Sequence, residues 1–425
     1  MLGTSIVLIA LALLGAPLFA IIAAAAIIGF YGAGIDLSVV AIEFYRIAEM
    51  PVLLAIPLFT FAGYLLGESQ APERLVRLTT ALLGWLPGGL AIVSLASCAL
   101  FTAFTGASGV TIIALGALIY PALKHAGYRD TFNLGLVTTS GSLGLLFAPS
   151  LPLILYGIVV QQLGLTQQVT IKALFLAGLL PGLLMLVLLS GWSLWEGRRI
   201  RTPFAELSWR ETLAAVNESK WEIPLPLFVL GGIYGGFLAV SEAAAMTALY
   251  VLVVEVLIHR EIKIRHLAQV MQKSMVMVGG ILIILGTSLA STNYLIDAEA
   301  PTKLFTFISE HVSSQLTFLI LLNIFLLILG TMLDIFSALV IMVPLIVPVA
   351  ISYGVDPVHL GIIFLANMQI GYFTPPVGMN LFIASYRFEK PIIELYRATL
   401  PFFFILLSAV LIITYWPALS LYLPG

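Results

Sequence analysis

The sequence predicts an all-α polytopic membrane protein. Of its 425 residues, 61% are hydrophobic and only 9% are charged, whereas a soluble domain carries about 25% charged residues. The segment 2–30 contains no charged residue at all, as expected of membrane-spanning sequence. These two observations exclude an ordinary soluble enzyme, and the net charge of −2 argues against nucleic acid as a partner.

The N-terminal run and the single cysteine exclude further kinds of protein and site. The first basic residue is Arg46, so the run 2–30 has no basic n-region and we read it as a membrane anchor, not a cleaved signal peptide. Cys98 is the only cysteine, which excludes an internal disulfide framework and a cysteine-based metal cluster.

Apolar runs predict the membrane segments in chain order. In the first part of the chain they lie at about 2–14, 18–34, 51–67, 90–104, 110–123, 131–143, 150–160 and 173–195. In the remainder they lie at about 224–239, 242–258, 274–296, 313–329, 336–352, 358–370, 377–386 and 398–421. Two stretches that mix charges with apolar residues, 35–50 and 203–222, are predicted to be helices along the membrane surface.

Several of these segments are too short to span a bilayer. At 1.5 Å per residue, 110–123 covers about 20 Å of the roughly 30 Å of hydrocarbon. Such segments are therefore predicted to be half-helices or hairpin arms. Four interruptions separate them, at Thr105–Gly109, Gly144–Ser150, Gly330–Asp334 and Gly371–Pro376. Irregular backbone at membrane depth occurs where its N–H and C=O groups find hydrogen-bond partners in the protein or in a water-filled cavity, as in transporter binding sites.

The four interruptions form two pairs. Glycines and prolines recur in the same order at an offset of 227, the matches being Pro121 with Pro348, Gly127 with Gly354, Gly144 with Gly371, and Pro149 with Pro376. This pattern predicts an internal repeat, with residues 1–222 as the first half and 223–425 as the second.

Loop charge predicts that the two repeats have opposite orientations. The basic loop around 74–77 matches the mainly acidic segment 297–310, and the uncharged loop 161–168 matches the basic segment 387–397. Because basic loops stay in the cytoplasm, an inverted arrangement is expected, which places 16 of the 19 basic residues inside.

Each predicted repeat contains the same parts in the same order. A re-entrant hairpin is followed by a helix broken in the middle and then by a long helix. The predicted hairpins are 90–123 and 313–352, the broken helices 131–160 and 358–386, and the long helices 173–195 and 398–421.

Half-helices that end near the midplane could bind a carboxylate at their N-termini and a cation such as Na⁺ at their carbonyls and nearby hydroxyls. For the tip Thr105–Gly109 the alternative is close helix packing through small residues. For Thr374 and Pro376 the alternative to ligand binding is a simple proline kink.

Asp334 is the acidic residue that stands inside an otherwise apolar stretch. Ionisable groups at membrane depth are costly and mostly functional, so Asp334 is the strongest single candidate for binding a cation. The alternative is that it accepts hydrogen bonds from the hairpin's own backbone. Glu242 is expected near the outer interface in a structural role, and the amides of Asn367 and Asn380 could either join helices or bind ligand.

The sequence argues against two other functions, an intramembrane protease and a passive channel. The sequence Gly106–Gly109 also fits the nucleophile motif of rhomboid intramembrane proteases, but that chemistry needs a histidine base. All five histidines are expected in charged loops or at helix ends. A passive channel is disfavoured because no helix carries a ring of repeated polar residues.

At its interruptions the sequence resembles the large membrane subunit of tripartite ATP-independent periplasmic (TRAP) transporters. The resemblance rests on Thr105–Thr111, on Gly141–Gly157 and above all on Gly371–Phe382 with its Thr-Pro-Pro-Val-Gly stretch. It implies an inverted-repeat, elevator-type carrier in the bacterial inner membrane that imports an organic acid with Na⁺. A single-component carboxylate carrier driven by Na⁺ or H⁺ is the alternative.

The resemblance also implies ligands and partners. Residues expected at the Na⁺ sites are Thr105, Gly106, Ser108 and Gly144 in the first half, and Thr331, Asp334, Gly371 and Thr374 in the second. Residues expected at the substrate are Ser108, Pro149, Ser150, Pro376 and Asn380. The expected partners are a periplasmic substrate-binding protein and a small four-helix membrane subunit on a separate chain. The particular acid is not readable from the sequence.

Overall fold

Helices form all the regular structure of the described residues, which are 7–8, 10–12, 14–83, 85, 88–165, 168–198 and 208–424 in a computed structural model. Within these ranges, eight helices are long and apolar enough to cross a membrane, and a bent pair makes a possible ninth. This confirms the all-α polytopic prediction. Parts of the predicted segments 2–14 and 203–222 lie outside the described residues.

The helices of the first half include the predicted segments in order, but the predicted basic loop around 74–77 is helical and belongs to α5. They are α2 (Leu18–Gly32), α3 (Ser38–Ala48), η1 (Pro51–Leu54), α4 (Ala55–Glu68), α5 (Ala71–Leu83), α6 (Gly89–Thr105), α7 (Ser108–His125), α8 (Asp130–Ser140), η2 (Leu143–Leu146), α9 (Leu151–Gln162), α10 (Ile171–Gly197) and α11 (Trp209–Glu218).

The second half begins with two helices that flank a turn and then repeats the same succession. Its helices are α12 (Pro224–Tyr234), α13 (Val240–Leu252), η3 (Val253–Ile258), α14 (Ile264–Asp297), α15 (Ala300–Ser309), α16 (Gln315–Met332), α17 (Ile335–Ser352), α18 (Pro357–Gly371), α19 (Met379–Phe388), α20 (Ile392–Tyr415) and α21 (Ala418–Leu421).

The pairs α6–α7 and α16–α17 are helical hairpins, each with a two-residue turn. In the second hairpin the open ends meet, because the Tyr353 ring stacks on Phe318 at 4.6 Å and its hydroxyl donates to Val312 O at 2.8 Å. The arms are longer than predicted: α7 has 18 residues, about 27 Å at 1.5 Å per residue. The apolar run 110–123 is shorter than the helix because α7 also includes polar residues at both of its ends.

Both predicted broken helices are interrupted where expected. The axis bends by 42° between Asp130–Leu146 and Leu151–Gln162. In the second half, the seven residues 372–378 separate the end of α18 at Gly371 from the start of α19. Each interruption contains a cis peptide bond, at Ala148–Pro149 and at Pro375–Pro376.

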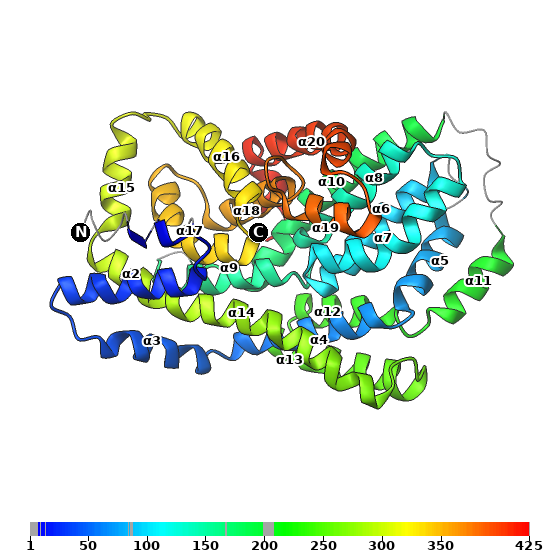
Figure 1. Cartoon of the computed structure of the whole chain (residues 1–425), viewed down its shortest axis with the longest axis horizontal. Coiled ribbons are helices and arrows are strands. Elements are labelled where there is room, and N and C mark those ends of the chain that lie inside the picture. Colours follow the sequence, from blue (N-terminus) through cyan, green and yellow to red (C-terminus); the bar gives the residue numbers. More distant parts are fainter. Residues whose placement is uncertain are drawn as a thin grey trace.

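One matched pair of helices, α5 and α15, lies at opposite ends of the molecule (Figure 1), whereas the matched long helices α10 and α20 contact each other. Figure 1 shows α5 and α11 at one end of the long axis and α15, the counterpart of α5, at the other, all roughly across that axis. The 34-residue α14 runs along much of the length between these ends. The opposite orientation of the two halves across the membrane stays a prediction.

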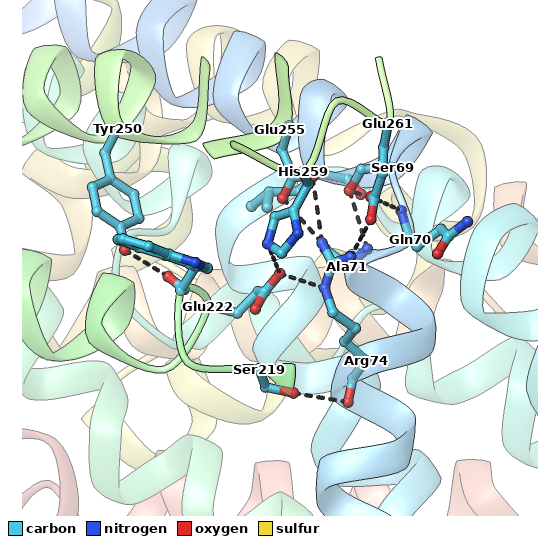
Figure 2. A network of polar contacts seen from close by, with 12 residues as sticks. Ser69, Gln70, Ala71, Arg74, Ser219, Glu222, Tyr250, Glu255, His259 and Glu261 are labelled. Carbon is cyan, nitrogen blue, oxygen red and sulfur yellow. Dashed lines mark hydrogen bonds and ion pairs between the residues drawn. The ribbon is translucent and has the colours of Figure 1, made fainter. Parts of the chain in front are cut away.

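A buried ion network fixes α5 to the neighbouring helices (Figure 2). The Arg74 guanidinium donates from Nε to Glu222 at 2.5 Å, from Nη2 to Glu255 at 3.3 Å and from Nη1 to Glu261. The side chains of Arg74, Glu222 and Glu255 are at most 5% exposed. The three carboxylates come from the chain before α12, from η3 and from the loop after it. One arginine therefore joins α5 to three carboxylates that lie 148 to 187 residues further along the sequence.

The charge balance of this network affects the ionisation of Glu261, which lies outside the membrane-spanning segments. Burial alone raises the pKa of Glu261, but the hydrogen bond from Arg74 and the Gln70 N–H lower it more, so the net shift is below the usual value. Glu261 thus stays ionised beside the arginine at neutral pH.

Candidate ion and substrate site

The first hairpin tip is a tight turn packed against the first broken helix. Gly106 ends α6 with φ +65°, a left-handed conformation that favours glycine, and a Cβ there would lie 2.5 Å from Leu151 Cδ1. One turn earlier, Thr102 Oγ1 donates to Gly141 O at 2.9 Å. A Cβ on Gly144 would lie 2.3 Å from Ala99 O. The structure therefore brings the tip and the Gly144 break together, as the sequence predicts.

The second tip is packed against the second break in the same way. Gly330 and Gly371 approach so closely that a Cβ on Gly371 would lie 2.5 Å from the Gly330 backbone. Gly378 N donates to Thr331 O at 3.0 Å, and Thr374 Oγ1 donates to Ile370 O at 2.7 Å. The predicted residues of the second site are thus also assembled.

Asp334 caps the N-terminus of α17. Its Oδ1 accepts hydrogen bonds from Phe336 N and Ser337 N, each at 3.0 Å, and its Oδ2 accepts one from Ser337 Oγ. All three donors belong to the first turn of its own helix. This geometry favours the structural alternative for Asp334, although carboxylate lone pairs remain that could still face a cation.

The tip of the first hairpin also contacts the second half, and this contact joins Ser108 and Asn380, which are expected together at the substrate from the sequence. Ser108 Oγ donates to Asn380 Oδ1 at 2.7 Å, and Asn380 Nδ2 donates to Thr138 O at 3.2 Å. A second contact of this kind joins the two broken helices, since Ser142 Oγ donates to Gln369 O at 3.3 Å. Ser142 and Gln369 are separated by the repeat offset of 227, the signal that could have identified them.

The remaining residues expected at the substrate have definite local roles. Ser150 caps α9, donating from Oγ to Leu145 O at 2.5 Å and accepting from Leu153 N at 3.4 Å. Pro149 and Pro376 form the two cis bonds. Pro376 is exposed, and its carbonyl accepts the Tyr396 hydroxyl at 2.7 Å.

Two buried polar side chains at the site have no protein partner within the described residues. The Thr105 hydroxyl, in a residue with 0% exposure, makes no hydrogen bond, and neither does the Gln369 amide, in a residue with 1% exposure. Leaving a buried polar group unpaired costs about 1–3 kcal/mol, so such groups mark places where a ligand or water is expected. Sequence reasoning missed Gln369, because a single amide in an apolar run carries no distinctive pattern.

The site offers oxygen ligands and helix ends but little formal charge. In the described parts of the hairpins and broken helices, the basic residues lie in end turns: Lys124 and His125 in the last turn of α7, His359 in the first turn of α18 and Arg387 in the last turn of α19. No three His, Cys, Asp or Glu side chains of the described residues cluster to hold a metal ion. Carbonyl and hydroxyl oxygens suit a hard cation, and free helix N-termini suit an anion. Ser108 is bonded to an amide and not to an imidazole, which gives the protease alternative no support.

Hairpins and broken helices that meet inside a helical membrane bundle define a membrane transporter of the broken-helix class. Comparison with known proteins gives the particular family. The family model described as the tripartite ATP-independent periplasmic transporter, DctM component, matches residues 2–419. The chain belongs to this family of inner-membrane transport proteins, which are not enzymes and work with a small membrane subunit and a periplasmic binding protein.

Several characterised relatives align along most of the chain. It is 33% identical over 399 residues to the C4-dicarboxylate TRAP transporter large permease of Rhodobacter capsulatus, covering 92% of this chain and 91% of the relative. It is 31% identical over 420 residues to the ectoine/5-hydroxyectoine large permease of Ruegeria pomeroyi, covering 98% and 96%. It also matches the isethionate permease of Oleidesulfovibrio alaskensis at 33% over 389 residues, but spans only 60% of that longer protein.

A solved structure shares the fold. The YdaH transporter of Alcanivorax borkumensis, reported with an unusual topology, superposes with a TM-score of 0.61 over 92% of this chain and 89% of that one, at 14% sequence identity. This similarity concerns the fold alone.

Proposed function

We propose that this chain is the membrane permease of a Na⁺-coupled TRAP importer for an organic acid, that it receives the acid from a periplasmic binding protein, and that it moves the acid by an elevator-type motion. The observation that carries the proposal is that each hairpin tip packs against a broken helix, with an unpaired buried Thr105 hydroxyl at the end of α6 and an unpaired buried Gln369 amide near the end of α18. The Na⁺ sites proposed are the tip Thr105–Ser108 with Gly144, and Thr331 and Asp334 with Gly371–Thr374.

An acidic substrate is supported by the chemistry of the site and of the relatives. Helix ends supply N–H donors for a carboxylate, and Na⁺ bound nearby would offset its charge. C4-dicarboxylates and sialic acid appear in the names of related permeases, but so does ectoine. The small subunit is proposed to be a separate chain.

Thr105 allows a sharp test of cation binding. Thr105→Val removes an unpaired buried hydroxyl without changing shape, so a structural role predicts unchanged or slightly higher stability. If the hydroxyl binds Na⁺, the Na⁺ concentration for half-maximal uptake should rise several-fold. The measurement is initial uptake in proteoliposomes with the small subunit and binding protein. Thr247→Val, which removes a buried hydroxyl from α13, is the matched control and should leave the Na⁺ curve unchanged.

The same assay tests Asp334 and the partner requirement. Asp334→Asn keeps an oxygen but loses charge, so a moderate rise in Na⁺ requirement is expected. A wild-type Na⁺ curve for both Asp334→Asn and Thr105→Val would refute the cation sites. Without the binding protein, uptake should be close to background; rapid uptake by the membrane subunits alone would instead indicate a carrier that needs no binding protein.

A further inference from the structure

A cavity of about 250 Å³ lies at the ends of α8, α10 and α20, away from the hairpin tips. Its lining includes Arg129, Arg397, Trp192, Trp195 and Glu196. Arg129 directly precedes α8, both tryptophans lie in the last two turns of α10, and Arg397 lies in the second turn of α20. Because α10 and α20 are membrane spans, the cavity is at the depth where tryptophan and arginine meet lipid headgroups.

The cavity presents positive charge with donors still available. Arg129 Nε donates to Glu196 Oε1 at 2.6 Å, which leaves its two terminal nitrogens for another acceptor. Arg397 is exposed and makes no hydrogen bond or ion pair with any residue that the structure describes. The three charged lining groups sum to +1, which matches the single negative charge of a phosphodiester.

A second, independent observation also points to an acceptor ligand. The indole N–H of Trp192 is buried and has no hydrogen-bond acceptor within the described residues. The Trp192 ring stacks on Trp195 at 4.8 Å, so the ring position is fixed. An indole N–H can only donate, and a phosphate oxygen in the cavity would satisfy it.

An apolar track continues from the cavity toward the bilayer. Arg397, Leu400 and Phe404 are spaced i, i+3 and i+7 and therefore share one face of α20. Leu400 is 53% exposed and Phe404 59% exposed. A molecule with a phosphate head and acyl chains fits both the charged cavity and this face, whereas a free phosphate uses only the cavity.

We propose that this cavity binds the headgroup of an anionic phospholipid, with Arg129, Arg397 and the Trp192 N–H on the phosphate and the acyl chains along α20. Basic pockets between membrane helices recognise anionic lipid headgroups through charge and donor geometry. The site does not depend on the transport function proposed above.

The test is native mass spectrometry of the full chain with added dioleoyl phosphatidylglycerol or dioleoyl phosphatidylcholine. Phosphatidylglycerol should bind at least about fivefold more tightly. Arg397→Gln should weaken its binding about fivefold, the equivalent of ~1 kcal/mol for one basic residue, and Trp192→Phe, which keeps the ring but loses the donor, should also weaken it. Arg265→Gln, an exposed arginine near the start of α14, is the control and should have no effect.

Three outcomes would overturn the proposal. Equal binding of the two lipids would remove the role of negative charge. Equal phosphatidylglycerol binding by the Arg397→Gln and Arg265→Gln variants would place the lipid elsewhere. Displacement of phosphatidylglycerol by millimolar inorganic phosphate would show a site for a free anion.

Discussion

Single residues in this chain show how far chemistry can be read from sequence. Asp334 was conspicuous as an acid in an apolar run, yet its carboxylate is engaged by the first turn of α17. Glu255 and Glu222 are more deeply buried than Asp334 but were not singled out. Their burial depends on Arg74, which is 148 residues from Glu222 in sequence, and a local pattern carries no information about such a pairing.

At the scale of single residues, the structure predicts that Arg74 is important for stability. Arg74→Met should destabilise the protein by about 3–5 kcal/mol, because Glu222 and Glu255 would remain buried without their cation. Thermal unfolding of the purified chain in detergent measures the loss. Arg77→Met is the matched control, since Arg77 pairs with Glu211 and Glu218 on the surface and exposed pairs contribute little. Equal losses for the two variants would contradict the importance of burial.

The same network predicts a dependence on acid. The pKa of Glu261 is lower in the folded protein than its usual value, so its ionisation stabilises the fold above the unfolded pKa of about 4.3. This contribution should disappear as the pH falls below that value. The melting temperature of the wild type should therefore drop more steeply between about pH 5 and 3 than that of Arg74→Met.

At the scale of helices, the order of the apolar segments was predictable. The helix lengths were not, and neither were α5 and α15, whose charged residues made their sequences resemble loops. The glycine and proline interruptions located both tips and both breaks, because those residues permit turns that others resist. The hairpin arms predicted from hydropathy are too short, because Ser108 and Lys124 belong to α7 although neither residue is apolar. The start of α14 was predicted at 274, ten residues after its actual start at Ile264, because the first turns of that helix contain Arg265 and Lys273.

Gly371 tests the close packing of α16 on α18. Gly371→Ala would place a methyl group 2.5 Å from the Gly330 backbone, where no flexible side chain can yield, and such overpacking costs typically ~1–3 kcal/mol. The melting temperature should fall. Gly279→Ala in α14 meets nothing within 4 Å and should raise stability by up to ~1 kcal/mol. A neutral Gly371→Ala would show that the helices can separate freely.

At the scale of the whole molecule, the repeat was predictable from spacing and its orientation from loop charge. The meeting of Ser108 and Asn380 was expected only from the family resemblance. The contact of Ser142 with Gln369 was not predicted, because no local pattern indicates which residue lies opposite another one 227 positions away. Apolar periodicity says which face of a helix is buried but not against which partner.

Matched positions can establish the orientation of the halves. His125 and Ser352 are both exposed, at the ends of α7 and α17, and are related by the offset of 227. In a Cys98→Ala background, cysteine at 352 should react with a membrane-impermeant maleimide in intact cells, and cysteine at 125 only after permeabilisation. Reaction of both from the same side would exclude the inverted arrangement.

The hydrogen bonds between the two halves imply that both sequence repeats contribute residues to the proposed substrate site. Ser108 donates to Asn380, and Ser142 donates to Gln369, so the proposed substrate site, with Ser108 in one half and Asn380 in the other, is complete only when both halves are present. An ancestor with a single repeat would have needed to dimerise to transport anything. Two fragments separated between α10 and α11 should likewise be inert alone and recover function through complementation when they are produced together in one cell.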